Sequence, residues 1–212
     1  MGHSKAEKTE THKRVVKIAS KRLRESGLAG VGIAELMKEA GRTVGGFYRH
    51  FDSRDDLVAE AVRSAFGTWK RQVDAATSGE PPFSYAKLID DYLSETHRNN
   101  PGTGCPYSAL AGELARSGKR TRAVVTEQVR NDIQLIADLL PGKDKRAARS
   151  KAILTFSALV GAMALARVVS DDALHREILD TVGKFLKSVA LQRQTVDTPT
   201  HSCSICKSAP NP

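Results

Sequence analysis

The chain has 212 residues and a formal net charge of +9, with 40% hydrophobic but only 5% aromatic residues. This length allows one domain or two small ones, and the apolar share is sufficient for a hydrophobic core. The polar N-terminus lacks a signal-peptide pattern, no apolar run reaches the roughly 18–20 residues of a membrane span, and three cysteines do not form a disulfide framework. These features argue against the secreted and membrane classes, so we expect a cytoplasmic protein.

Strong helix formers dominate the chain, which predicts an all-α fold. The excess positive charge is concentrated at one end, because residues 1–54 contain twelve Lys or Arg against six Asp or Glu. Such an asymmetry favours a polyanionic partner, nucleic acid in particular, although a basic solvated surface would give the same composition.

Three helices are predicted in the N-terminal part of the chain. The first spans about residues 7–26, where apolar residues recur at helical spacing, and Gly27 ends it in the left-handed conformation. The second spans about 33–40 and ends at Gly41, and a short third helix spans about 44–50. Two short helices joined by a glycine-containing turn indicate a helix-turn-helix, whose second helix enters the major groove of DNA.

Six further helices are predicted after residue 53, and Asp52 or Ser53 can cap the first of them. Their approximate ranges are 54–76, 84–98, 105–117, 125–140, 145–169 and 171–192. We therefore divide the chain into an N-terminal domain over residues 1–53, a C-terminal domain over 54–193, and a polar, Pro-rich tail over 194–212 that is expected to be disordered.

The third predicted helix carries side chains suited to nucleic acid. A helix of about two turns is short for a core element but long enough to reach base edges and phosphates, and Phe47 and Phe51 can anchor it. Gly45 and Gly46 each disfavour a helix by about 1 kcal/mol, yet they would let a DNA backbone approach closely. A frayed turn is the alternative to a helix here.

The sequence from about residue 13 to 58 resembles the N-terminal domain of the TetR/AcrR family of repressors, most clearly in GFYRHFDSRDDL. In that family a tyrosine and a histidine contact phosphates, a basic residue opening the fourth helix contacts another, and residues at the start of the third helix read bases. The sequence departs from the family at Val44, where lysine is frequent, and at Gly32, where a Ser or Thr cap is usual. The resemblance implies DNA contacts from Arg42, Thr43, Val44, Gly46, Tyr48, Arg49, His50 and Arg54.

The resemblance also implies that the C-terminal domain binds a small-molecule inducer and forms a homodimer. The segment AILTFSALVGAMALARVV is apolar nearly all round, so a second subunit is expected to cover it, with Leu159 and Phe185 at the interface. Two-fold symmetry then predicts a palindromic double-stranded DNA operator. The expected function is a ligand-responsive transcriptional regulator, a repressor that the inducer releases from DNA.

Cys105 is a candidate trigger for release. Pro106 suits the first position of a helix, which places Cys105 at the N-cap, where the helix dipole favours a thiolate. Some family members with a similar Gly-Cys at this helix start sense reactive electrophiles, so the resemblance supports an electrophile or oxidant sensor. A buried structural cysteine is the alternative.

Other candidate sites are weaker. The resemblance implies that Tyr92, Tyr107 and Trp69 lie on helices that line the inducer cavity, although such residues more often belong to the core. In the tail, His201, Cys203 and Cys206 could bind zinc or form a redox pair, but three ligands fall short of a structural site, so no metal is expected. Nucleotide-binding, metalloprotease and hydrolase motifs are missing from the sequence, so we expect neither an enzyme nor a cofactor.

Overall fold

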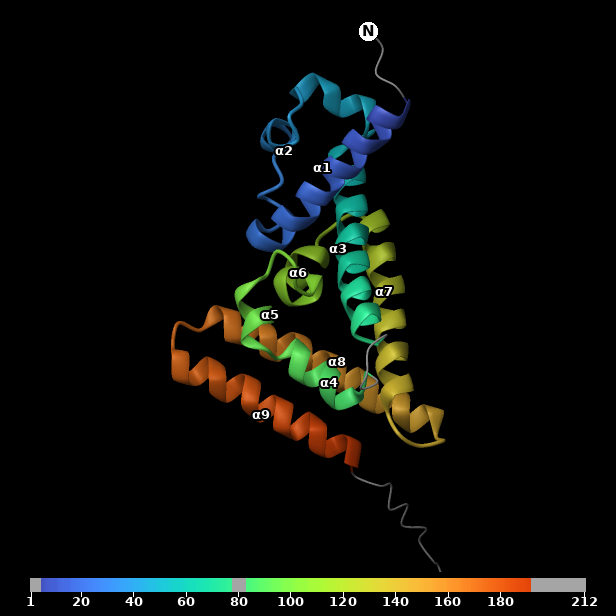
Figure 1. Cartoon of the computed structure of the whole chain (residues 1–212), viewed down its shortest axis with the longest axis vertical. Helices are drawn as coiled ribbons and strands as arrows, with labels where there is room; N and C mark the ends of the chain where they lie inside the picture. The colour runs from blue at the N-terminus through green and yellow to red at the C-terminus, as the bar shows by residue number, and fades with distance from the viewer. Residues whose placement is uncertain (1–4, 78–82, 192–212) are drawn as a thin grey trace, which may run out of the picture.

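The computed structural model describes residues 5–77 and 83–191, and every regular element in this part of the chain is a helix (Figure 1). The predicted all-α fold is confirmed. For residues 68–77 and 190–191 the structure describes the helical backbone but not the side chains. The side chain of Trp69 therefore lies outside the described part. The elements are α1 (Lys5–Ser26), α2 (Ile33–Glu39), the 3-10 helix η1 (Val44–Arg49), α3 (Arg54–Thr77), α4 (Tyr85–Tyr92), α5 (Glu95–Asn99), α6 (Pro106–Leu114), α7 (Lys119–Leu139), α8 (Lys145–Val168) and α9 (Asp172–Leu191).

The first three elements form a small head at one end of the molecule (Figure 1). The two predicted helix ends are confirmed, because Gly27 and Gly41 have φ angles of +74° and +69°, which glycine adopts without steric cost. After Gly41 the chain turns sharply, and the amide of Arg42 donates to the carbonyl of Met37 at 2.8 Å. This closed turn sets the direction in which η1 leaves α2.

The third element, η1, is a 3-10 helix rather than an α-helix. The amide of Gly46 donates to the carbonyl of Thr43 at 3.0 Å, and that of His50 donates to Phe47 at 2.9 Å, which are bonds of the i to i+3 type. Two adjacent glycines disfavour a longer α-helix at this point. The predicted position of the third helix is therefore confirmed, and its type is corrected.

The single helix predicted over residues 84–98 is wrong. The structure divides it into α4 and α5, because the hydroxyl of Ser94 accepts a hydrogen bond from the amide of His97 at 3.2 Å and caps a new helix. The serine within this periodic apolar segment therefore marks the start of a second helix. The break turns His97 into the interior.

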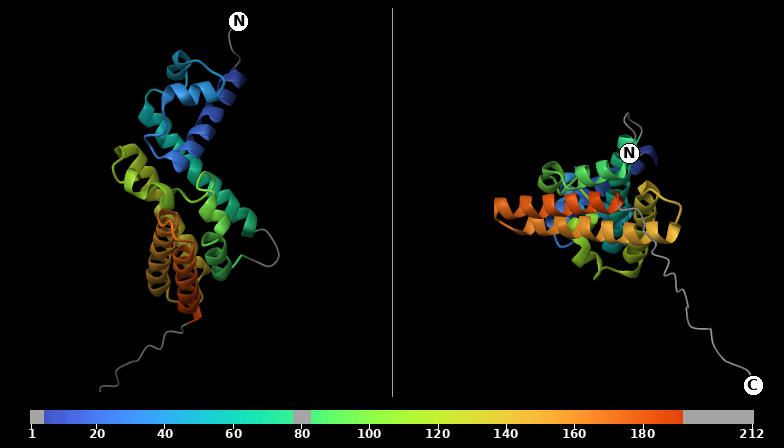
Figure 2. Two further views of the ribbon diagram at one scale, coloured as in Figure 1. Left: turned by 90° about the vertical axis from the view of Figure 1, so that its left-hand side faces the viewer. Right: turned by 90° about the horizontal axis from the view of Figure 1, so that it is seen from below.

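The body is built around α3, α7 and the pair α8–α9. Helix α3 leaves the head and runs beside α7, while α8 and α9 lie side by side and antiparallel across the far end (Figures 1 and 2). Helix α6 occupies the joint, where it contacts α1, α3, α7 and α8. The predicted boundary after residue 53 stays a prediction, since α3 packs against both the head and the body.

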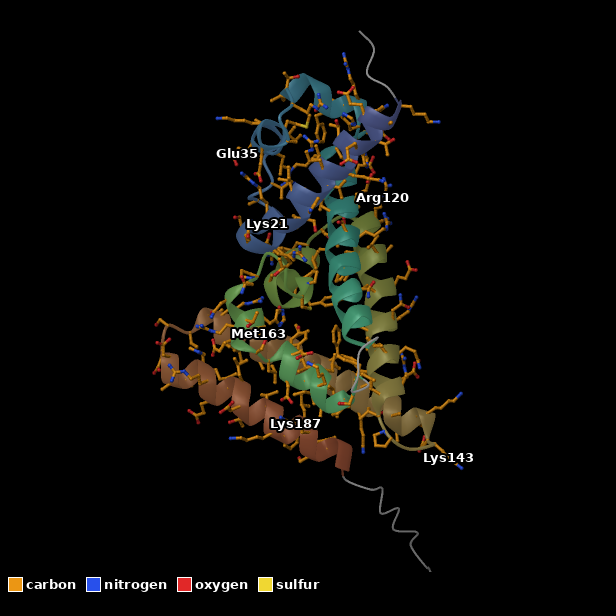
Figure 3. All side chains as sticks on the ribbon, viewed as in Figure 1. Lys21, Glu35, Arg120, Lys143, Met163 and Lys187 are labelled. Atoms are coloured by element: carbon orange, nitrogen blue, oxygen red, sulfur yellow. The ribbon has the colours of Figure 1, made fainter. Side chains whose placement is uncertain are left out.

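Polar contacts hold α7 against α3 and the head against the body. Arg120 projects from the start of α7 towards α3, where it pairs with Asp56 (Figure 3). At the end of α1, the amide of Leu28 donates to the Glu113 carboxylate of α6 at 2.5 Å. One continuous apolar core underlies these contacts and includes Leu23, Leu36, Met37, Phe47, Leu57, Ile89, Leu110, Leu159 and Met163.

Candidate nucleic-acid interface

The short helix η1 packs on buried aromatic side chains with one face and is exposed to solvent on the opposite face. Phe47 and Phe51 are buried with their ring centroids 5.3 Å apart, so the predicted anchors are confirmed. Tyr48 packs edge-on against Phe47 at 5.2 Å yet is 70% exposed, and Val44 is also exposed. A buried aromatic base therefore presents polar and apolar side chains outward from a rigid support.

Neither glycine of η1 is required by crowding within the described part of the chain. A Cβ at Gly45 would meet no atom of the described residues within 4 Å, and one at Gly46 would meet Met37 only at ordinary contact distance, 3.6 Å. The free space lies outside the chain. An approaching backbone of another molecule would use that space.

A groove with a volume of about 680 Å³ lies between the first turns of α1, the end of α2, and η1. It brings together six of the eight residues that the sequence predicts to contact DNA. Three further lining residues, Glu7, Lys8 and Thr11, come from α1 and were missed by the sequence prediction. The groove is lined by Glu7, Lys8, Thr11, Met37, Gly41, Arg42, Thr43, Gly46, Tyr48, Arg49 and His50.

Arg42 lies along α1. Its Nη2 atom donates to Thr11 Oγ1 at 2.9 Å and to the Glu7 carboxylate at 3.2 Å. The guanidinium thus forms one wall of the groove and ties the turn before η1 to the first helix. The sequence predicted a DNA contact for Arg42 but gave no sign of this intramolecular pairing.

His50 is surrounded by basic side chains. Burial lowers the pKa of His50, and His12, Lys8, Arg42 and Arg49 lower it further because a second positive charge is unfavourable beside them. The His12 ring stacks on Phe51 at 4.5 Å, and its Nε2 lies 2.6 Å from the Glu60 carboxylate. His50 is therefore a neutral imidazole in the free protein at neutral pH.

The missed residues of α1 had a usable signal. Thr11 lies four residues after Glu7 and three after Lys8, a spacing that places side chains on one face of a helix. That face turns towards η1. A polar stripe on the first helix could thus have been assigned to the site from spacing alone.

Arg54 is engaged inside the head. Its side chain donates to the carbonyl oxygens of Leu28 and Val31 in the loop between α1 and α2. These carbonyls follow the end of α1, so the guanidinium stabilises the loop. The phosphate contact predicted for Arg54 stays a prediction.

The predicted sensing residues lie in the body. Cys105 is the N-cap of α6, as expected, but it is only 1% exposed. Burial raises the pKa of the Cys105 thiol above its usual value, and hydrogen bonds from Tyr92 and the backbone amides of Tyr107 and Ser108 only reduce this effect. The expected lowering of this pKa is therefore wrong, because desolvation outweighs the helix terminus.

Tyr92 and Tyr107 are both buried near Cys105. Burial also raises the pKa of each phenol, so both remain protonated. The Tyr107 ring packs between Phe66 at 4.8 Å and Phe156 at 5.1 Å. The two tyrosines thus lie in an aromatic and polar cluster at the start of α6, which agrees with either a core or a cavity wall.

The buried side chain of His97 links two backbone segments through hydrogen bonds next to the start of α6. Its Nδ1 atom donates to the carbonyl of Tyr92 at 2.6 Å, and its Nε2 atom accepts from the amide of Cys105 at 2.9 Å. Only the neutral ring satisfies both partners. Burial and the nearby Arg167 lower the pKa of His97 to about 4, although the bond to Tyr92 opposes the shift.

We expect acid to destabilise the protein through His97. Its pKa is lower in the folded than in the unfolded state, so the unfolded state takes up a proton first as the pH falls from about 6.5 towards 4, and stability is lost over that range, by about 3 kcal/mol at most. Urea unfolding at pH 7 and pH 5 measures the loss. His97→Gln should be less stable at pH 7 but should lose less on acidification, and equal losses would contradict this role.

Other sites predicted from sequence receive less support. Among the residues that the structure describes, no group of three or more His, Cys, Asp or Glu side chains could hold a metal ion. His201, Cys203 and Cys206 lie outside the described residues, as does the tail predicted over 194–212.

Comparisons with known proteins agree with this geometry. Residues 16–61 match the sequence pattern of bacterial regulatory proteins of the tetR family. No curated protein sequence matches the chain. Among solved structures, a TetR transcriptional regulator from Chloroflexus aurantiacus is 24% identical, with a TM-score of 0.72 over 89% of this chain and 98% of the other.

Two further structures have the same fold. A TetR-family regulator from Cytophaga hutchinsonii is 16% identical, with a TM-score of 0.72 over 91% of this chain and all of its own. The reduced form of NemR from E. coli is 18% identical, with a TM-score of 0.68 over 84% of this chain and 96% of its own. The matches extend over head and body alike, so the whole helical arrangement is shared.

Proposed function

Because the chain belongs to the TetR family of transcriptional regulators, we propose that it is a cytoplasmic, ligand-responsive repressor without catalytic activity, which binds a palindromic DNA operator as a homodimer. The observation that carries the proposal is the anchored helix η1. Its exposed Val44 and Tyr48 stand over a buried aromatic base, beside a groove lined by Lys8, Arg42 and Arg49. Side chains of this kind contact base edges and phosphates.

The direct test is selection of binding sites from a randomised duplex library with the full chain. We expect an inverted repeat whose half-sites lie one helical turn apart, about 34–36 Å. A gel shift on the selected duplex and on a scrambled duplex then measures preference. Equal binding to both duplexes would refute sequence-specific regulation and leave only charge-driven association.

Tyr48 and His50 should contribute phosphate contacts. We expect Tyr48→Phe and His50→Ala each to weaken binding of the selected duplex by about 3- to 30-fold, because each removes a hydrogen bond to the DNA backbone. Operator titrations at several salt concentrations measure the effect, and circular dichroism should remain native. Unchanged affinity in both variants would contradict the proposed orientation on DNA.

The dimer is proposed to form through α8 and α9. Both helices carry large apolar side chains that the described part of the chain leaves largely exposed, namely Leu154, Leu165 and Val168 on α8 and Phe185 on α9. By length and composition α8 could also cross a membrane, with 33% of its apolar stretch buried. The exposed Phe185 of α9 favours a second subunit as the cover, because α8 and α9 pack against each other and both expose large apolar side chains.

The inducer is proposed to bind within the body, near the aromatic cluster of Phe66, Tyr107 and Phe156. Residues at the start of α6 line this region, and α6 contacts α1. A ligand that displaces α6 would therefore move the head. Covalent sensing at Cys105 remains the alternative trigger, but the buried, protonated thiol favours a non-covalent inducer.

A further inference from the structure

The groove of the head already contains an anion from the chain itself. The Glu7 carboxylate lies 3.2 Å from Arg42, among the cationic side chains of Lys8 and Arg49. Glu7 belongs to the first turn of α1, and Arg42 to the turn before η1, so the pair joins two segments that line the groove. An acidic residue thus occupies a place whose surroundings favour an external anion.

This intramolecular pair is suited to exchange. The side chains of Glu7 and Arg42 are 44% and 31% exposed, and solvent-exposed ion pairs contribute little to stability. A phosphate carries the same charge type and accepts hydrogen bonds from a guanidinium in the same way. Thr11 is buried, and its hydroxyl bonds to the same Arg42 nitrogen at 2.9 Å, so it keeps the guanidinium in place when the carboxylate leaves.

We propose that the groove between α1 and η1 is a binding seat for a phosphate of the operator backbone, and that the Glu7 carboxylate occupies this seat in the free protein. The inference rests on the proposed DNA binding. The exposed Tyr48 and its neighbour Arg49 both belong to η1 and both line the groove, so a phosphate in the seat is next to the base-reading element. Glu7 lowers the affinity for any duplex, because its carboxylate must leave before the phosphate enters.

The matched pair of variants is Glu7→Gln and Glu10→Gln. Both remove one negative charge from the same exposed stretch of α1, but only Glu7 lines the groove and pairs with Arg42. Fluorescence anisotropy with the full chain measures binding to the selected operator duplex and to a scrambled duplex. We expect Glu7→Gln to bind both about 3- to 10-fold more tightly, and Glu10→Gln to change binding by less than about 2-fold.

A double-mutant cycle separates a local exchange from diffuse charge. Arg42→Ala should weaken binding, and Glu7→Gln should then have little further effect, because the guanidinium with which the Glu7 carboxylate pairs is gone. The dependence of affinity on salt should stay close to that of the wild type in Glu7→Gln, because the same phosphate enters the seat in both proteins. Equal tightening in the Arg42→Ala background, or equal tightening by Glu10→Gln, would overturn the seat.

The outcomes also distinguish the seat from the function on which it rests. If the wild-type chain prefers the selected duplex but Glu7→Gln binds it no more tightly than the wild type, the phosphate seat is refuted. The proposed function as a sequence-specific regulator is then retained. If the wild-type chain has no preference for any duplex, the proposed function fails first. Circular dichroism of each variant confirms that the exposed substitutions leave the helices intact.

Discussion

Arg24→Ala should lower the free energy of unfolding by about 3 kcal/mol, the largest effect that we expect from one side chain of the head. Arg24 is 6% exposed and has no acidic partner at hydrogen-bond distance among the described contacts; it donates to the carbonyl oxygens of Ser20, Ala65 and Gly104 at 3.1, 3.5 and 3.2 Å. These acceptors lie on α1, on α3 and just before α6. Truncation would remove the guanidinium donor from the Gly104 carbonyl, which lies outside a helix, and would leave a cavity at the joint.

Arg22→Ala is the matched control, because it removes the same residue type from the same helix. Arg22 pairs with Glu35 and Glu39 at 3.1 and 2.6 Å, but on the surface, where such pairs contribute about 0–1 kcal/mol. The melting temperature should fall by roughly 6–12 °C in Arg24→Ala and by less than half of that in Arg22→Ala. Comparable losses would show that the carbonyl contacts of Arg24 are not the source of its contribution.

Phe185→Glu should convert the dimer to a monomer and reduce operator affinity by about 100-fold or more, because each half-site would then bind alone. Phe185 is 66% exposed in the single chain, so the new carboxylate is solvated in the monomer and buried only in the dimer. Light scattering measures the mass, and circular dichroism should remain native.

Two substitutions delimit this prediction. Ala123→Glu adds a charge to the exposed face of α7 and should leave the mass unchanged. Leu159, which the sequence placed at the interface, is 1% exposed within its own chain, so that assignment is wrong and Leu159→Glu should unfold the protein instead. A wild-type chain that is monomeric at micromolar concentration would contradict the interface itself.

Features set by local chemistry could be predicted from sequence. The ends of α1 and α2 follow from Gly27 and Gly41, and the anchoring of η1 follows from two phenylalanines that flank exposed polar residues. The order of helices follows from apolar periodicity. These signals lie within a few residues of the elements that they determine.

Features set by distant segments could not be predicted. Arg42 meets Glu7 across 35 residues, and Arg54 meets the carbonyl of Leu28 across 26. Cys105 has a local reason for a low pKa, but burial beneath other helices reverses the sign. In each case contacts with distant segments, rather than the residue's own helix, determine its hydrogen-bond partners or its pKa.

The 3-10 geometry of η1 limits how much sequence information one head can read. Three residues per turn align Gly45 with Tyr48 and Gly46 with Arg49, so two of its three side-chain rows begin without a side chain. We expect each half-site to be specified over only a few base pairs, which recur by chance throughout a genome. Discrimination would then come from the spacing of two half-sites and from the deformability of the uncontacted DNA between them.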